Sequence, residues 1–369
     1  MSSPTGLGAN GEEAAGIPEV LLLFPYLPLT ESVYLGPWEL IPNARITEAE
    51  VVASWIATTL PQLLELYRTP DADWTAVGCV AKLRTKPVGT PIDPARYRPL
   101  HRAVVAAFLD GNPDGPSETR QGWAVATSDN ALMYRHKLGP DGYIAVRYGA
   151  MVQALVGGLQ VGTDHSQIRP PSELHVPFMH SPIDELYAAA LMEELSKGTD
   201  DARRLGGAID WLDIAWRNTV SIDEDTRIIA LRAGFEVLLG AGDTTSAITD
   251  ALCSLLDSAD AEKLTRTWTT RSGNSKSAEL SDPGWWFQRF SFLRNKLMHG
   301  EQPGEDDFLN DGERHLWLGE AHLRRAIKTT VAGSGNPAVL QSPLERTLSE
   351  VADELGLDSA GSDGEAEVP

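Results

Sequence analysis

Four prolines in one short stretch divide this chain into two parts with different sequence patterns. The stretch 167–182 contains Pro170, Pro171, Pro177 and Pro182. Proline lacks a backbone N–H and fixes φ, so a helix is not expected to cross this stretch. Short apolar runs precede it, whereas apolar residues at helical spacing follow it. Because 369 residues exceed the usual size of one domain, we predict an α+β N-terminal domain over 19–175 followed by an all-α domain over 183–331.

The N-terminal part has the pattern of short strands and turns. Five apolar runs are bounded by Gly, Pro, Asp or Asn: 21–24, 74–83, 103–109, 123–127 and 143–148. Such bounded runs are typical of short strands. Thr47 and Glu50 have the spacing of a capping box. We therefore expect a helix to open there and to continue through Val51, Trp55 and Ile56.

The C-terminal part has the periodicity of helices. Apolar residues three or four positions apart predict helices near 183–191, 209–220, 225–239, 248–256, 285–299 and 313–331. Gly240 and Gly300 are expected to end two of them, because glycine readily takes the left-handed cap conformation. The polar stretch 269–283 is expected to be an exposed loop.

The two ends of the chain differ from both parts. Residues 1–18 are rich in Gly, Ala, Ser and Glu without the pattern of a secretory signal, and we expect a loose tail. Residues 332–355 are expected to form a linker with a short helix over 344–355, followed by a disordered acidic tail over 356–369.

Composition restricts the classes of function. No apolar run approaches the roughly 18 residues needed to cross a bilayer. Cys79 and Cys253 are the only cysteines and lie far apart, which indicates neither a disulfide framework nor a structural zinc site. We therefore expect a cytoplasmic protein with no membrane partner, no metal and no cofactor.

Charge is distributed unevenly along the chain. The formal net charge of −21 disfavours a general nucleic-acid coat protein, because an acidic field repels phosphate. Residues 262–300, however, contain seven basic and three acidic side chains, a net charge of +4. This basic segment is either chance clustering on a solvated surface or a local site for an anion.

The motif at the end of this segment gives it a chemical meaning. Arg294 and Asn295 are followed by His299 and Gly300, late in a predicted helix. RNA can be cleaved when its 2′-hydroxyl attacks the adjacent phosphorus, which requires proton transfer and stabilisation of phosphoryl charge. Histidine exchanges protons near neutral pH, and the arginine fork suits phosphate. Arg294 and His299 therefore have the side chains that a metal-independent cleavage needs.

The segment 293–300 resembles the R-x4-6-H signature of the HEPN superfamily, in which Arg-Asn is often followed by His-Gly. The upstream helix over 227–239, with acidic Glu236, is similar to a helix of ApeA-like HEPN proteins. This resemblance covers about 183–331 and implies a HEPN-type helical bundle. It also implies an endoribonuclease of phage defence that acts by abortive infection on transfer or messenger RNA, with a phage-derived trigger.

The resemblance also implies roles for individual residues. His299 would be the general acid or base, Arg294 would stabilise phosphoryl charge, and Asn295 would position the substrate or His299. Glu236 would support the motif, although an ion pair with Arg232, four positions earlier, is an equal alternative. Four basic residues of the segment are candidate RNA contacts: Lys296, Arg289, Lys276 and Arg271.

Helical geometry separates the two reactive residues. At about 100° per residue, Arg294 and His299 lie roughly 140° apart around a regular helix, whereas Asn295 lies on the His299 side. In HEPN proteins two motif helices face each other, and the cleft receives residues from both subunits. The resemblance therefore implies a homodimer or higher homo-oligomer, whose isolated monomer is poorly active.

Three other readings compete with this one, and the weakest is an enzyme whose chemistry lies in the N-terminal half, where no motif can be assigned. Lys296, His299 and Gly300 would also suit an ordinary helix C-terminus with no further role. A dimeric RNA-binding or adaptor protein could keep the HEPN fold without catalysis.

Several aromatic residues and histidines lie near the motif in the sequence. Trp286 is expected in the core, and Trp268 and Trp285 are candidates for base stacking. His315 and His322 share one helix face and are expected at the surface.

Overall fold

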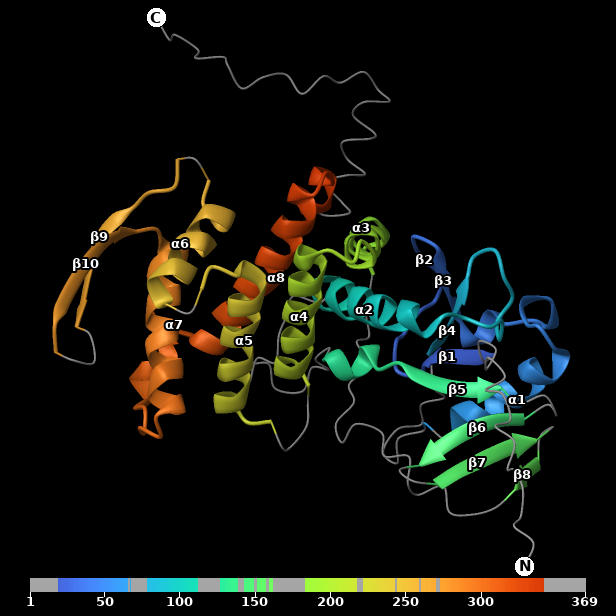
Figure 1. The fold of residues 1–369 in the computed structure, drawn as a ribbon. Helices are drawn as coiled ribbons and strands as arrows, with labels where there is room; N and C mark the ends of the chain where they lie inside the picture. Colours follow the sequence, from blue (N-terminus) through green and yellow to red (C-terminus); the bar gives the residue numbers. More distant parts are fainter. Residues whose placement is uncertain are drawn as a thin grey trace, which may run out of the picture.

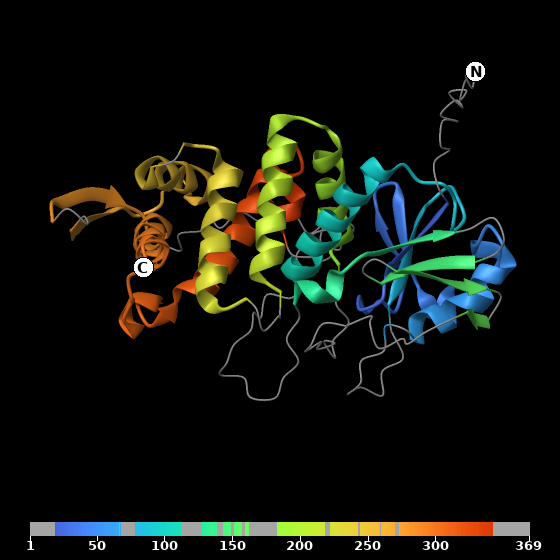
Figure 2. The same ribbon diagram turned by 60° about the horizontal axis from the view of Figure 1, so that its bottom comes forward.

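An antiparallel sheet region forms the N-terminal part of the molecule and a helical region forms the C-terminal part (Figure 1). The computed structural model describes residues 19–65, 67, 78–111, 127–138, 143–148, 151–156, 159–161, 183–217, 222–242, 244–258, 260–269 and 273–341. Figure 2 shows the sheet at one end of the molecule and a two-stranded hairpin at the other, with the helices between them.

Eight strands form the described sheet, in the order β2-β3-β4-β1-β5-β6-β7-β8. Their bounds are β1 (Val20–Phe24), β2 (Val33–Leu35), β3 (Trp38–Pro42), β4 (Cys79–Leu83), β5 (Tyr134–Leu138), β6 (Tyr143–Tyr148), β7 (Met151–Val156) and β8 (Leu159–Val161). All neighbouring pairs are antiparallel. In the centre, Leu22 of β1 lies between Ala81 of β4 and Arg135 of β5.

Strand β1 is buried on both faces of the sheet, which explains its continuous apolar sequence. Leu21 and Leu23 pack in a smaller core with helix α1 (Ser54–Glu65). Leu22 and Phe24 point to the opposite face, into a larger core that also contains side chains of α2 (Tyr97–Gly111) and of the helical region.

Some expectations for this part are confirmed and two are wrong. The runs 21–24 and 143–148 are strands, but 103–109 lies within α2. That run is apolar throughout because α2 is buried, and a buried helix cannot be distinguished from a buried strand by apolar residues alone. Thr47 makes no side-chain capping bond, and α1 begins only at Ser54. Val51 instead forms a bridge with Val88 in extended conformation, a tertiary contact that overrides the local capping signal.

Six helices form the described C-terminal region. They are α3 (Glu185–Ser196), α4 (Asp200–Ala215), α5 (Glu224–Leu239), α6 (Thr245–Leu256), α7 (Asp282–Met298) and α8 (His315–Gly333). Five of them begin after a Ser, Thr or Asp whose side chain accepts a hydrogen bond from the first turn, which satisfies a backbone donor that the helix leaves unpaired. The predicted helices of this region are thus confirmed within the described residues.

Helices α5 and α7 meet through an aromatic core. Phe235 of α5 contacts Trp286, Phe287 and Phe290 of α7, with ring centroids 5.2–6.5 Å apart. Trp286 and Phe290 are stacked at 5.0 Å. The core position expected for Trp286 is therefore confirmed, and this core fixes the helix that carries the motif.

A hairpin occupies much of the stretch expected to be a loop. Strands β9 (Leu264–Thr269) and β10 (Ser275–Leu280) pair with each other alone in the described part of the chain, and α7 begins directly afterwards at Asp282. Arg266 lies over the Trp285 ring at 5.8 Å, and Trp268 contacts Trp285 at 6.5 Å. Most of β10 is exposed, as expected, but the expectation of a loop was wrong for Ser275–Leu280 and for the start of α7. Packing on α7 stabilises strands that polar residues do not reveal.

Helix α2 joins the sheet to the helical region. Arg102 of α2 donates to Asp210 of α4 at 2.6 Å, and Lys328 of α8 pairs with Asp110 of α2 at 2.8 Å. The predicted boundary at 167–182, the tails at 1–18 and 356–369, and the helix over 344–355 lie outside the described residues. None of the described helices is both long enough and apolar enough to span a membrane.

Candidate functional site

Helix α7 presents the motif on its last turns. It begins at Asp282, one turn earlier than Trp285, because the Ser281 hydroxyl caps it by accepting from the backbone N–H of Gly284. His299 is the C-terminal cap, and Gly300 adopts φ +68°. The helix therefore ends at the predicted position, with the side chains of Met298 and His299 exposed.

Arg294 points to α5 and lies near its acidic residue. Arg294 Nη2 is 3.9 Å from Glu236 Oε1, and Arg294 Nη1 donates to Asn295 Oδ1 at 3.1 Å. Glu236 Oε1 also forms an ion pair with Arg232 Nη1 at 2.8 Å. The ion pair between Glu236 and Arg232 is thus present together with the contact to the motif, and one carboxylate is shared by two guanidinium groups.

Arg232 makes this cluster unusual, because it is a buried cation. It is 3% exposed, lies over the Phe287 ring at 4.8 Å and donates to Ser291 at 3.1 Å. Burial lowers the pKa of Arg232 to about 10, the charge of Glu236 opposes this shift, and the charge of Arg294 adds to it. With this pKa, Arg232 remains charged at neutral pH and can form an ion pair with Glu236. The Glu236 carboxylate lies closer to Arg232, at 2.8 Å, than to Arg294, at 3.9 Å.

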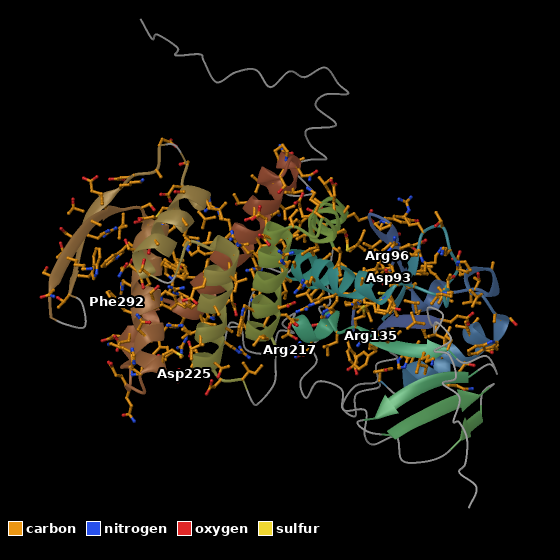
Figure 3. The ribbon with its side chains drawn as sticks, in the orientation of Figure 1. Asp93, Arg96, Arg135, Arg217, Asp225 and Phe292 are labelled. Atoms are coloured by element: carbon orange, nitrogen blue, oxygen red, sulfur yellow. The ribbon has the colours of Figure 1, made fainter. Side chains whose placement is uncertain are left out.

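A cleft of about 410 Å³ lies beside the other face of α7. Asn295, Lys296 and His299 line it from α7, together with Phe292 one turn before Lys296 and Arg289 two turns before it. Figure 3 places Phe292 between α7 and the hairpin, and Thr269 at the end of β9 also lines the cleft. Arg294 does not belong to this lining, as the helical geometry predicts.

The basic side chains of the cleft are held by neighbouring groups. Lys296 Nζ lies 2.6 Å from Asp307 Oδ1, and this hydrogen bond is the main reason why the pKa of Asp307 is lowered. Arg289 donates to Asn310 Oδ1 at 3.2 Å and to the Leu309 carbonyl at 2.9 Å. These contacts attach α7 to the segment that contains the 3-10 helix Glu305–Phe308 and the short strands β11 (Leu309–Asn310) and β12 (Glu313–Arg314).

Of the two histidines of α8, His315 is buried and His322 is partly buried, contrary to the expectation that both lie at the surface. His315 is 1% exposed and lines the cleft, and the His322 ring lies 4.6 Å from Trp286. Burial is the main reason why the pKa of each histidine is lowered to about 4, and the nearby charge of Arg289 (for His315) or Arg325 (for His322) contributes. Their seven-residue spacing showed that they share a face, but only packing against the aromatic residues of α7 decided that this face is internal.

Of the remaining candidate RNA contacts, Lys276 lies outside the cleft lining. Lys276 is an exposed residue of β10, opposite Trp268 of β9. Arg271 lies outside the described residues. Trp268 and Trp285 are partly buried against each other and against Arg266, so they form part of the contact between the hairpin and α7.

Sequence reasoning missed several residues of the cleft. They are Thr269, Phe292, Glu301, Asp306, Asp307 and His315. The acidic run 305–307, directly after the motif, was a visible signal for a segment that returns to the basic end of α7. Within the described residues, no three His, Cys, Asp or Glu side chains gather closely enough to hold a metal ion.

Comparisons of this chain with models of protein families, with curated proteins and with solved structures find no match. The resemblance to HEPN proteins therefore rests on the motif of α7 and the acidic residue of α5 alone.

Proposed function

We propose that this protein is a metal-independent endoribonuclease whose reactive groups lie at the C-terminal end of α7. The observation that carries the proposal is that His299 is exposed and lies one turn from Asn295. The side chain of Asn295 in turn accepts a hydrogen bond from Arg294. Glu236 of α5 contacts Arg294 and is itself held by an ion pair with Arg232. An ordinary helix C-terminus would not require an acidic residue of a second helix, here Glu236 of α5, beside its arginine.

In this mechanism the RNA supplies its own nucleophile. The 2′-hydroxyl loses its proton to a base and attacks the adjacent phosphorus, and the 5′-oxygen of the next nucleotide leaves with a proton from an acid. His299 would carry out one of these proton transfers, and Arg294 would stabilise the charge on the phosphoryl oxygens. Asn295 would orient the substrate. The products are a 2′,3′-cyclic phosphate end and a 5′-hydroxyl end.

The separation of Arg294 from His299 favours a homodimer as the active form. Within one chain His299 lines the cleft, whereas Arg294 faces α5. Two copies of α7 placed end to end across a twofold axis would bring the Arg294 of one near the His299 of the other. Met298, exposed at 54%, lies beside His299 and would be covered in such a pair.

The biological role that fits this activity is defence against phage by abortive infection, with transfer or messenger RNA as the substrate. The N-terminal sheet region would respond to a phage-derived trigger. Its attachment to the helical region through α2 supplies a physical connection between the two.

The test is incubation of purified protein with total RNA in the presence of a chelator, followed by mapping of fragment ends. We expect cyclic phosphate ends with the wild type and a loss of at least about 100-fold in rate with His299→Ala or Arg294→Ala, in the range typical of a general acid or base. Arg203→Ala, which removes an exposed arginine of α4, is the matched control and should retain activity.

Size-exclusion chromatography with light scattering should show that all of these variants keep the same oligomeric state. RNA that is bound but not cut would instead support a non-catalytic RNA-binding protein. Toxicity on overexpression that survives His299→Ala would point the same way.

A further inference from the structure

The cleft beside His299 has features of a binding site that the reaction itself does not use. Its volume of about 410 Å³ lies at the lower end of the range of small-ligand sites. It is formed by α7, the end of β9 and the segment that precedes α8, all within residues 269–315. His299 and Asn295 line it, so any occupant would lie next to the reactive groups.

We propose that this cleft holds one base of the RNA beside the scissile phosphate, and that it selects bases with an exocyclic amino group over uracil. This inference rests on the ribonuclease function proposed above and adds the specificity of that site. It makes the protein a base-selective nuclease that cleaves next to adenine, cytosine or guanine.

An aromatic ring is available in the cleft for stacking. Phe292 is partly buried and lies between α7 and the hairpin (Figure 3), where it lines the cleft. Unpaired RNA bases are commonly held by stacking on aromatic side chains, and such contacts tolerate any base because every base has a π face. Phe292 would therefore contribute affinity without selectivity.

The charges of the cleft favour a base over a phosphate. Its two permanent cations, Lys296 and Arg289, are already engaged by Asp307, Asn310 and the Leu309 carbonyl. Asp306, an exposed carboxylate from the adjoining 3-10 helix, also lines the cleft. A carboxylate accepts hydrogen bonds and repels phosphate, so it suits the amino group that adenine, cytosine and guanine carry and uracil lacks.

A buried polar atom also indicates a ligand. His315 is 1% exposed and lines the cleft, and its Nδ1 has no hydrogen-bond partner in the described part of the chain. A buried polar group without a partner is costly, and the edge of a bound base would supply one. Because burial lowers the pKa of His315, its ring is neutral at pH 7 and offers one donor and one acceptor.

The experiment uses DNA oligonucleotides with a single ribonucleotide, so that cleavage occurs at one position only. One series varies the base of the ribonucleotide and a second varies the base that follows it. We expect, in one series, uracil to be cleaved about tenfold more slowly than the best base, which is the size of one well-formed hydrogen-bonded base contact. Asp306→Asn, whose amide also donates, should reduce this discrimination.

Phe292→Leu should slow cleavage of all four substrates about tenfold, the size of one stacking contact. Phe292→Tyr should restore the rate, because its ring can stack equally well. Tyr34→Leu and Asp200→Asn, matched changes at exposed positions of β2 and α4, should leave base preference unchanged.

Each outcome separates this inference from the function on which it rests. Equal cleavage beside all four bases, or discrimination unaffected by Asp306→Asn, would overturn the base pocket and leave the ribonuclease intact. If no RNA is cleaved, binding of AMP, CMP, GMP and UMP is measured by ligand-observed NMR. Binding that favours the first three nucleotides and is lost in Phe292→Leu supports the pocket without the nuclease, whereas no binding overturns both.

Discussion

A single carboxylate shared by two arginines illustrates how this site is controlled at the scale of residues. Glu236 balances buried Arg232 at 2.8 Å and contacts Arg294 at 3.9 Å. The closer pair satisfies a charge that would otherwise be buried without a partner, which is costly. Arg294 is left with a looser contact and a hydrogen bond to Asn295, so it keeps freedom to reach a phosphate.

A second buried carboxyl group has a consequence for stability. Glu320 of α8 is 1% exposed, and burial raises its pKa to about 8, although Arg324 and Arg227 oppose the shift. The folded protein thus retains this proton at a pH where the unfolded chain has lost it. The contribution of Glu320 is therefore present below the pKa of the unfolded state, about 4.5, and is lost as pH rises toward about 8.

We expect the free energy of unfolding of Glu320→Gln to exceed that of the wild type increasingly from pH 5 to pH 8. The amide resembles the protonated carboxyl group in shape but cannot ionise, so the difference should grow by about 1.4 kcal/mol per pH unit at most. Urea unfolding at several pH values measures it. A difference that is constant with pH would show that Glu320 is ionised in the folded state.

At the scale of elements, α7 is defined at both ends by local signals. Ser281 caps its first turn, and Gly300, beyond its last turn, adopts φ +68°. A Cβ added at Gly300 would meet no heavy atom within 4 Å, so a substitution there tests backbone strain alone. Gly333, the last residue of α8, is equally open, but its φ lies outside the left-handed region.

We expect Gly300→Ala to reduce the free energy of unfolding by about 1 kcal/mol, because an L-residue is disfavoured in this conformation. Gly300→Asn should cost less, since asparagine tolerates it better. Gly333→Ala is the paired control and should be neutral or slightly stabilising, because alanine favours the helix. Thermal or urea unfolding of the three variants would contradict this account if Gly300→Ala and Gly333→Ala behaved alike.

At the scale of the whole molecule, α2 connects the sheet and the helical region through charged and apolar contacts. Asp210 of α4 accepts from both Arg98 and Arg102 at 2.6 Å. Burial alone would raise the pKa of Asp210, but these two hydrogen bonds outweigh it and the pKa is lowered. One core also contains side chains from β1, α2 and α5.

We expect the sheet and the helices to unfold together, because neither buries its share of this core alone. Asp210→Ala should lower the free energy of unfolding by roughly 1–3 kcal/mol, since it leaves the partly buried Arg102 without its partner. Arg98→Ala, at an exposed position, should cost less than about 1 kcal/mol. Hydrogen exchange measured in β1 and α5 should report one shared opening energy, and two separate values would contradict a joint core.

The sequence alone determined the features that depend on local chemistry. Helical periodicity predicted α5 and α7, Gly240 and Gly300 predicted their ends, and the apolar run at 21–24 predicted β1. Rotation along a helix also separated Arg294 from the face that His299 and Asn295 share with the cleft. These features follow from backbone geometry and burial, which neighbouring residues encode.

Only the tertiary structure decided what depends on contacts between distant segments. The hairpin of β9 and β10 forms because Arg266 and Trp268 pack on Trp285, and Val51 is extended because it pairs with Val88. Likewise, His315 is internal because α8 packs against the aromatic residues of α7. In the cleft, the acidic run 305–307 indicated a contact with the basic end of α7, but only the tertiary structure placed Thr269 and His315 beside it.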